Sequence, residues 1–570
     1  MERLYIGLIV SPTPMRGLSG IRSLRISNGP FDSITTPVKR CPLQSPTPVK
    51  SLSVLEFVMS ISLPRFAGSV GVVSHVVGFT TLMLSMLLMA PFASAATATY
   101  TGGAGDHLAS TPGNWSTGLA PTANDDVVIG PSSEAIQWDV SASGTINRLQ
   151  LESSFTGALT LGRAITVVTN LQILGGSLIT GRDLATPITA NFLYIAPAAT
   201  IVVRRSSTLG EGAGQTITVG TLILEGVITA DGEGFDHYSG PGRGTYGRGA
   251  THGGLGAYAY IEEYGHTYGS MENPTSLGSG GGTPWGVGGA GGGAITINGF
   301  LLVLNGGSRI SADGATGGDD EGNTAGAGGS ITFSANVLSN SGIIRANGGN
   351  GAVSGTWHQP GGGGRISVNQ VSFLSMGTME VNGGVGSGIY GGAYTGTKAY
   401  AGTIYFDANT RAHLDVVNHL RLGSDDTNGY GFGDVVIHNG GVLEIDGNPN
   451  RNGFAQGFGG AATLLVSTLN IEAGGALRAD GFGFTFWDGF GSGRYAVGGS
   501  YGGEAGASEP NDTYGSITDP RFLGSNASNS SGGFGGGALL VVATTSVVIN
   551  GTVSANGLDS TTEGGGGGSG

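Results

Sequence analysis

Clusters of acidic residues are the first candidates for chemistry in this chain. One cluster lies between residues 231 and 236, and a second lies between residues 313 and 321. Carboxylate oxygens grouped in this way are ligands for Ca²⁺. The chain lacks GGxGxD nonapeptides, however, and Asp-Gly is a common turn pair, so we interpret these acids as turn residues and assign no metal ligands. The residues concerned are Asp231, Glu233, Asp236, Asp313, Asp319, Asp320 and Glu321.

Other residues with catalytic potential lack the spacing that catalysis needs. His237, His252 and His266 share one stretch but do not have the spacing of a zinc site. Glu262 and Glu263 are adjacent in sequence, which does not make an acid/base pair. The glycine blocks have no Lys-Ser/Thr ending, and no GxSxG has triad partners in reach. We therefore assign no catalytic or cofactor-binding residue, which favours a protein that is not an enzyme. We expect no cofactor, and a bound Ca²⁺ is the alternative.

Composition and charge point to an exported protein. Gly accounts for 112 of 570 residues and Pro for 21, while 39% of residues are hydrophobic, so the chain has enough apolar side chains to form a core. With 8 basic and 3 acidic residues before residue 96, the remainder has 17 basic and 36 acidic residues. This acidic surface repels nucleic acid and anionic membranes. The single cysteine, Cys41, excludes a disulfide framework.

The first 95 residues have the layout of a leader and a secretory signal. Residues 1–58 have no hydrophobic period, and we expect them to be unstructured or to precede the true start at Met59. Residues 59–95 contain a basic residue, Arg65, then an apolar run, and then Ala93-Ser94-Ala95, which fits a cleavage site. The alternative is an uncleaved anchor. We favour cleavage, which leaves no stable membrane span and predicts a secreted or cell-surface protein.

Beyond residue 95 the sequence predicts only β-structure. Short runs of alternating apolar residues, bounded by Gly or Asn, fill residues 96–230, which we interpret as an N-terminal capping region followed by short strands. From residue 231 to 570 a glycine block, a strand, a turn and a second strand ending in Asp/Asn-Gly recur. Strand starts at Ala294, Ser330, Arg365 and Thr403 are 36, 35 and 38 residues apart. The fold class is therefore all-β, a parallel β-helix or β-solenoid of glycine-rich coils.

Two long insertions interrupt these repeats, at residues 231–289 and 480–533. Both contain the pattern TYGS-x3-P-x2-LGS, from Thr267 to Ser279 and from Thr513 to Ser525. One interpretation is structural: Tyr268, Tyr514, Leu277 and Leu523 pack the insertions on the scaffold. The other is a ligand-binding lip of aromatic side chains, and we favour the first because duplicated loops are repeat geometry. The lip would consist of Tyr246, Tyr258, Tyr260, Tyr264, Trp285, Phe482, Phe484, Phe486 and Trp487.

At its end the chain reaches another glycine block, where a further strand is expected. Glycine and Asn/Asp at the corners of such repeats permit positive φ. No capping segment follows Gly564, so we expect residues 231–570 to be truncated at the C-terminus.

Two stretches resemble families of exported proteins. Gly113–Ile129 resembles the opening motif of bacterial exported β-helix and autotransporter-passenger domains, and the resemblance implies a structural, capping role for Trp115, Pro121, Asp125 and Asp126. The shared YGS…P…LGS pattern resembles segments of glycine-rich repeat proteins from large exported bacterial proteins and from plants. That resemblance implies an architecture and no enzymatic activity.

The expected function is that of a non-catalytic exported surface or extracellular-matrix protein. A rigid solenoid would display loops for adhesion, with an extracellular glycan or a surface protein as partner. The alternative is a β-helix polysaccharide lyase or glycoside hydrolase, because the same scaffold supports both chemistries.

Overall fold

The computed structural model describes most of the chain from residue 96 to residue 559. All of these residues belong to the second of two compact units, Pro91–Gly570. The predicted leader and signal peptide, residues 1–95, lie outside the described residues. The gaps within the described part are residues 246, 258–266, 283–287, 319–322, 353–357, 370–371, 376, 388–394, 407–412, 417–418, 423–429, 449–458, 462, 485–488, 494–496, 506–512, 519 and 528–532.

The described residues form β-strands and loops, with one short 3-10 turn, η1 (Pro112–Asn114), which confirms the all-β prediction for this part of the chain. None of their helices is long and apolar enough to cross a bilayer. The strands of the first sheet, in spatial order, are β1 (Thr97–Thr99), β2 (Asp126–Ile129), β5 (Arg148–Leu151), β7 (Ile165–Ile173), β9 (Ile188–Ile195), β11 (Gln215–Leu224), β13 (Ala294–Leu304), β15 (Ser330–Asn340), β17 (Arg365–Asn369) and β22 (Thr403–Phe406), with β4 (Thr145–Ile146) beside β7 and β18 (Ser372–Ser375) beside β15.

A second sheet contains shorter strands that alternate along the chain with those of the first. In spatial order they are β3 (Ala135–Trp138), β6 (Ala158–Leu161), β8 (Ser177–Ile179), β10 (Thr200–Val202), β12 (Val227–Thr229), β14 (Arg309–Ser311), β16 (Ile343–Arg345), β19 (Thr378–Glu380), β24 (His419–Leu422), β26 (Val442–Ile445), β30 (Ala476–Arg478) and β32 (Thr552–Ser554).

Three smaller sheets complete the described strands. One is parallel, with β23 (His413–Val416), β25 (Tyr430–Ile437), β29 (Thr463–Ile471) and β31 (Leu540–Ile549). The other two are antiparallel pairs, β20 (Val385–Ser387) with β21 (Thr395–Lys398) and β27 (Gly447–Asn448) with β28 (Gly460–Ala461).

The strands of the two large sheets pair in parallel, and across β13, β15, β17 and β22 the register is constant. Ile295 of β13 lies beside Ile331 of β15, which lies beside Ile366 of β17, which lies beside Ile404 of β22. All four side chains are fully buried. Because the side-chain period of a strand is two residues, this register keeps one apolar face turned inward on every strand.

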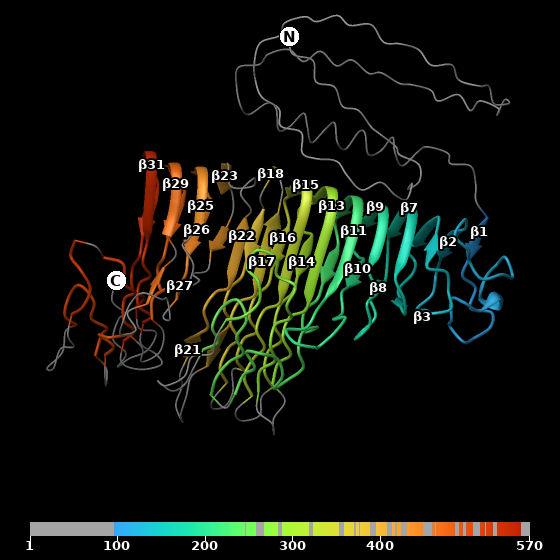
Figure 1. The fold of residues 1–570 in the computed structure, drawn as a ribbon, viewed down its shortest axis with the longest axis horizontal. Coiled ribbons are helices and arrows are strands. Elements are labelled where there is room, and N and C mark those ends of the chain that lie inside the picture. Colours follow the sequence, from blue (N-terminus) through green and yellow to red (C-terminus); the bar gives the residue numbers. More distant parts are fainter. Residues whose placement is uncertain are drawn as a thin grey trace, which may run out of the picture. The chain divides into compact units, whose positions relative to one another are not determined.

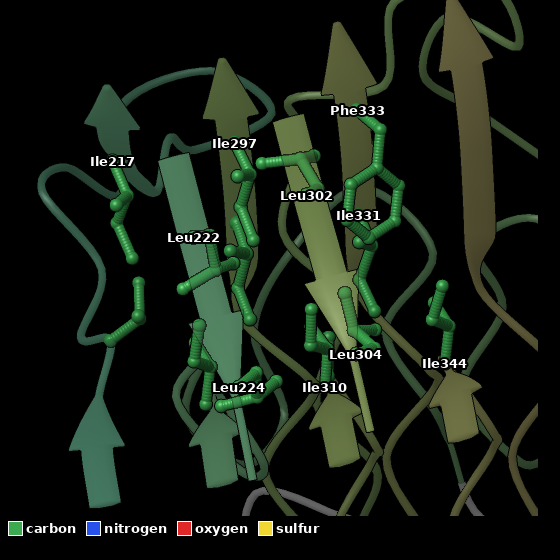
Figure 2. Close-up of a cluster of buried hydrophobic side chains, with 14 of the residues drawn as sticks. Ile217, Leu222, Leu224, Ile297, Leu302, Leu304, Ile310, Ile331, Phe333 and Ile344 are labelled. Atoms are coloured by element: carbon green, nitrogen blue, oxygen red, sulfur yellow. The ribbon is translucent and has the colours of Figure 1, made fainter. Parts of the chain in front are cut away.

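The apolar core lies between the two large sheets. Figure 2 shows Ile217, Ile297 and Phe333 from the first sheet together with Ile310 and Ile344 from the second. Each of these side chains is buried. Burying one such side chain stabilises a fold by roughly 1.5–3 kcal/mol, so the alternating pattern read from the sequence accounts for the packing of the sheets.

Glycine-rich segments outside the strands are also buried and regularly hydrogen-bonded. The consecutive amides of Gly291, Gly292 and Gly293 donate to the carbonyls of Phe235, Ala327 and Ala230, which lie on two other segments of the chain. A Cβ at Gly292 would lie 2.0 Å from the Ala312 carbonyl oxygen. None of these three glycines has a positive φ, so here the sequence needs glycine for close backbone contact and not for the left-handed conformation expected at the corners.

A loop closes the start of both large sheets. Trp115 is 3% exposed and packs edge-on against Tyr100 and Trp138, with ring centroids 5.4 and 6.3 Å away. Its Nε1 donates to the Ala109 carbonyl at 2.8 Å. The Ala109 amide in turn donates to Gln137 of β3, so this loop covers the outer edge of the second sheet, a geometry that agrees with a capping role for Trp115.

The other residues of that opening motif lead into the first paired strands. Pro121 is buried. The Asp125 carboxylate accepts the Thr122 amide at 2.7 Å and the Thr122 hydroxyl at 2.8 Å. Asp126 is the first residue of β2, which pairs with β1. The turn from Pro121 to Asp126 is therefore fixed by local side-chain hydrogen bonds.

Candidate functional site

The two long insertions occupy corresponding places in the fold. The first leaves the second sheet after β12 and returns to begin the long strand β13. The second leaves after β30 and returns to begin the long strand β31. Figure 1 shows both groups of loops extending from the same side of the strand array.

The shared motif of the first insertion is held together by a tyrosine. The Tyr268 hydroxyl donates to the Leu277 carbonyl at 2.5 Å and lies 2.7 Å from Ser279 Oγ. Ser279 Oγ also accepts the Gly242 amide at 2.9 Å. Leu277 is fully buried, and burial raises the pKa of Tyr268, so this hydroxyl stays protonated.

The second insertion repeats these contacts in detail. The Tyr514 hydroxyl donates to the Leu523 carbonyl, and Ser525 Oγ donates to the Tyr514 hydroxyl at 2.9 Å. Ser525 Oγ also accepts the Gly491 amide at 2.9 Å. Leu523 is fully buried and Tyr514 is 9% exposed. In both insertions the motif thus folds the loop, which agrees with the structural interpretation of these residues.

A second ring packs against each motif tyrosine. His252 lies 4.7 Å from Tyr268, and Tyr501 lies 5.0 Å from Tyr514, measured between ring centroids. The Tyr268 amide donates to the His252 carbonyl at 3.2 Å, and the Tyr514 amide donates to the Tyr501 carbonyl at 3.0 Å. His252 and Tyr501 are therefore equivalent positions in two copies of one local fold.

Strands of the chain itself cover the first insertion. Thr332 Oγ1 of β15 donates to the Pro274 carbonyl at 2.8 Å, and Ser367 Oγ of β17 donates to the Glu272 carbonyl at 2.5 Å. His252 is fully buried, and its Nδ1 donates to the Gly328 carbonyl at 2.7 Å. This face of the first insertion is used for internal packing.

The same face of the second insertion has no covering strand among the described residues, of which only β31 and β32 follow it. Phe490 is 52% exposed, and Ile517 is fully exposed. A Cβ at Gly253 would lie 2.1 Å from the Gly364 carbonyl oxygen, whereas a Cβ at the equivalent Gly502 would meet no atom within 4 Å. The face of the second insertion that carries Phe490, Ile517, Thr518 and Pro520, together with the half-buried Tyr501, is our candidate functional site.

The alternative interpretation, an aromatic lip, is wrong where the structure describes its residues. Phe482 and Phe484 are 7% and 1% exposed, so neither reaches a ligand. Phe482 instead lies over the Arg421 guanidinium at 4.0 Å. The sequence reasoning missed Phe490, although its place beside Gly489 and Gly491 marks it as an aromatic residue among glycines. The other proposed lip residues, Tyr246, Tyr258, Tyr260, Tyr264, Trp285, Phe486 and Trp487, lie outside the described residues.

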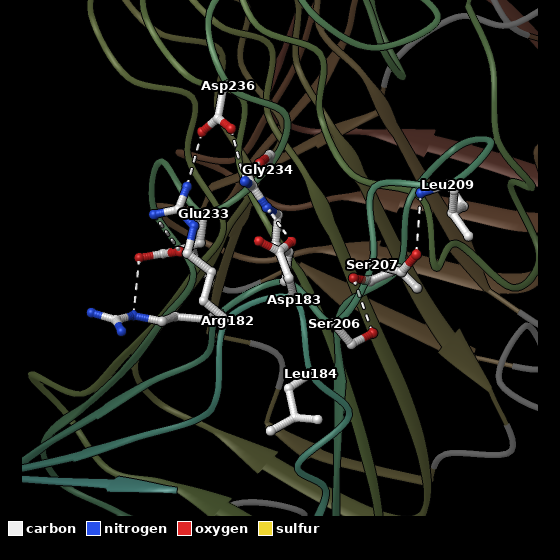
Figure 3. A network of polar contacts seen from close by, with 12 residues as sticks. Arg182, Asp183, Leu184, Ser206, Ser207, Leu209, Glu233, Gly234 and Asp236 are labelled. Atoms are coloured by element: carbon white, nitrogen blue, oxygen red, sulfur yellow. Dashed lines mark hydrogen bonds and ion pairs between the residues drawn. The ribbon is translucent and has the colours of Figure 1, made fainter. Parts of the chain in front are cut away.

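Two of the acidic candidates form ion pairs at the base of the first insertion (Figure 3). Arg205 is 6% exposed and donates to Asp183 at 2.9 Å, to Asp236 at 2.8 Å and to the Gly234 carbonyl at 2.8 Å. The Arg205 hydrogen bond holds the pKa of Asp236 below its ordinary value. Burial raises the pKa of Glu233 despite arginines nearby. The arginines thus neutralise the carboxylate charge that a metal ion would need for binding. The cluster also ties the insertion to the loops after β8 and β10.

Asp231 and Asp313 act as corner residues between neighbouring strands. Asp231 Oδ1 accepts the Asp313 amide at 2.7 Å, and Asp313 Oδ1 accepts the Asn347 amide at 2.8 Å. Asn347 Oδ1 accepts the Asn382 amide at 2.7 Å, which continues the same ladder. These contacts agree with the turn interpretation. Asp319, Asp320 and Glu321 lie outside the described residues, and within the described part no three His, Cys, Asp or Glu side chains are grouped as metal ligands.

The histidines of the first insertion are not brought together where the structure describes them. His237 is exposed, whereas His252 is fully buried, and burial lowers the pKa of His252 to about 3. His266, Glu262 and Glu263 lie outside the described residues.

Comparison with protein-family models, with curated proteins and with solved structures finds no match to this chain.

Proposed function

We propose that this chain is a non-catalytic exported protein of the cell surface or extracellular matrix, whose parallel β-solenoid displays loops for adhesion. The strand order supports the solenoid, because successive strands alternate between two parallel sheets and each pairs with its counterpart one repeat later. An array of this kind is long and stiff, since each repeat is fixed by its neighbours. Export is supported by the residues 59–95 pattern and by the acidic composition of the rest.

One observation carries the adhesive role. The second insertion repeats the local fold of the first, and both extend from the same side of the strand array. A rigid scaffold that presents related loops on one side is suited to binding a partner. The partner on this proposal is an extracellular glycan or a surface protein.

The experiment combines binding with a test for cleavage. The purified chain is run through gels containing soluble polysaccharides, and the same polysaccharides are assayed for new reducing ends and for unsaturated products. We expect retardation in at least one gel and no cleavage product. Polysaccharide cleavage by the purified chain would overturn the non-catalytic proposal.

The alternative, a polysaccharide lyase or glycoside hydrolase, rests on Glu233 and Asp236. Their environments move the two pKa values apart, upward for Glu233 and downward for Asp236, as in acid/base pairs. Arg182 and Arg205, however, bind Asp236 at 2.9 and 2.8 Å and occupy its oxygens. If cleavage is found, Glu233→Gln should abolish it, because Gln cannot donate a proton to a leaving group.

A further inference from the structure

We propose that the outer face of the first sheet, from β7 to β15, binds a proline-containing peptide segment of a partner protein. Hydroxyl groups of the face donate to backbone carbonyls of that segment, and Phe300 packs against its proline. This inference rests on the proposed adhesive function and assigns a site to its protein partner. The chain itself supplies the argument, because the same face already binds a segment of the first insertion.

At β15 and β17 this face holds the first insertion by its backbone carbonyls. Thr332 Oγ1 of β15 donates to the Pro274 carbonyl at 2.8 Å, and Ser367 Oγ of β17 donates to the Glu272 carbonyl at 2.5 Å. Asn369 Nδ2, also of β17, donates to the Glu272 carbonyl at 3.2 Å. Thr332 and Ser367 are buried by this contact. Side-chain donors of the face thus bind a peptide backbone without pairing it as a strand.

The row of outward side chains that ends at Asn369 continues across the sheet beyond the insertion. In strand register this outer row passes over β17, β15, β13, β11, β9 and β7, and it consists of Asn369, Ser334, Asn298, Thr218, Thr189 and Thr166. Thr166, Thr189 and Thr218 are exposed, and no described residue forms a hydrogen bond with their hydroxyl groups. The outer row is therefore covered at one end, and its other end presents hydroxyl groups to solvent.

The spacing of the strands suits a short peptide laid across them. Glu272 and Pro274 are two residues apart and are held by neighbouring strands, which lie about 4.8 Å apart in a sheet. From Ser334 on β15 to Thr166 on β7 the outer row crosses four such intervals, or about 19 Å. Six extended residues span about 20 Å, so a segment of this length brings carbonyl groups to each of the strands.

The side chains of the outer row favour a peptide backbone over a charged group. None of its residues is charged, and each threonine offers one hydroxyl donor. Phe300, two residues along β13 from Asn298, is 63% exposed. Proline has a carbonyl that accepts a hydrogen bond and no amide that would need an acceptor, and its ring packs well on aromatic side chains. Pro274 in the bound segment of the first insertion has the same character.

Fluorescence anisotropy of a labelled peptide, SMENPTSL, the sequence of residues 270–277, measures binding to the full chain. The variants are Thr189→Val, Thr218→Val and Phe300→Ala, and the control is Thr200→Val, in β10 of the second sheet. We expect saturable binding that each variant of the face weakens about two- to tenfold and that the control leaves unchanged. Because the outer row is uncharged, the affinity should change little with salt concentration. Circular dichroism of each variant checks that it is folded.

The other outcomes separate this inference from the proposed function. Absence of saturable binding by the folded chain would overturn the inference, and so would equal binding by the parent and all three variants of the face. If these variants instead weaken retardation in polysaccharide gels and leave peptide binding unchanged, the face binds a glycan, which overturns the peptide partner while the adhesive function stands. Polysaccharide cleavage by the purified chain would overturn the adhesive function itself, whatever the peptide does.

Discussion

Asp313 shows how one corner side chain joins neighbouring strands of the second sheet. Its carboxylate accepts the Asn347 amide and pairs with Arg345 Nε at 2.7 Å, while its own amide donates to Asp231. Burial and the negative charge of Asp231 raise the pKa of Asp313 to about 7, and they outweigh the opposing effect of Arg345. At this scale the fold is fixed by a polar ladder whose charge depends on pH.

The first prediction concerns that charge. Below the ordinary value of 3.8 Asp313 is protonated in the folded and unfolded chain; between 3.8 and about 7 only the folded chain holds the proton. The contribution of this proton to stability is therefore complete below 3.8 and is lost as pH rises toward 7. In Asp313→Asn this loss disappears, and the free energy of unfolding should fall less with rising pH, by up to about 1.4 kcal/mol per pH unit.

Urea denaturation of the parent and of Asp313→Asn across this pH range measures the effect. The comparison is made between the two proteins at each pH, because His252, with its lowered pKa, changes stability in the opposite direction in both. Parallel stability curves for the two proteins would show that Asp313 does not titrate as stated.

At the scale of an element, glycine allows the insertions and the strands to come into backbone contact. A Cβ at Gly253 of the first insertion would lie 2.1 Å from the Gly364 carbonyl oxygen, next to β17. Backbone cannot move away as a flexible side chain can, so the contact between the insertion and its cover has no room for even one added methyl group. Gly502, at the same position of the second insertion, has no such neighbour.

The second prediction compares alanine substitutions at these two glycines, so that Gly502 serves as the control for Gly253. Gly253→Ala should destabilise the protein by about 1–3 kcal/mol, because the added methyl overpacks a buried contact. Gly502→Ala should change stability by less than about 0.5 kcal/mol, because the added methyl meets no neighbour. Thermal unfolding of both variants checks this, and equal effects at the two positions would contradict the difference in covering between the insertions.

At the scale of the whole described unit, each strand depends mainly on its neighbours in the two sheets. The loop around Trp115 ends this array on one side, where it covers strands β1 and β3 with hydrogen bonds and packed rings. In a stacked array the loss of an end cap acts first on the adjacent strands.

The third prediction follows from that dependence. Trp115→Ala leaves a cavity beside Tyr100 and Trp138 and should cost about 3–5 kcal/mol locally. Hydrogen exchange should become faster in β1 to β3 and stay slow in β13 and β15. A uniform loss of protection along all strands would mean that the unit unfolds as one block and that Trp115 is not an end cap.

The sequence by itself determined the strands and their common register. Alternating residues such as Ile295, Ile331 and Ile366 predict one buried face, and their spacing predicts which residues lie side by side, because strand pairing preserves the period of two. The repeated TYGS…LGS pattern likewise predicted two related insertions, since the same local hydrogen bonds require the same residues.

The tertiary structure alone decided which surfaces are covered. Gly253 and Gly502 each begin the same Gly-Gly pair, yet one meets the backbone of Gly364 and the other meets no described atom. The same holds for Phe484, which is buried, and Phe490, which is exposed. Covering depends on segments that lie far away in the sequence, and local patterns carry no information about contacts of that range, so the candidate site became visible only when the strands were placed against the insertions.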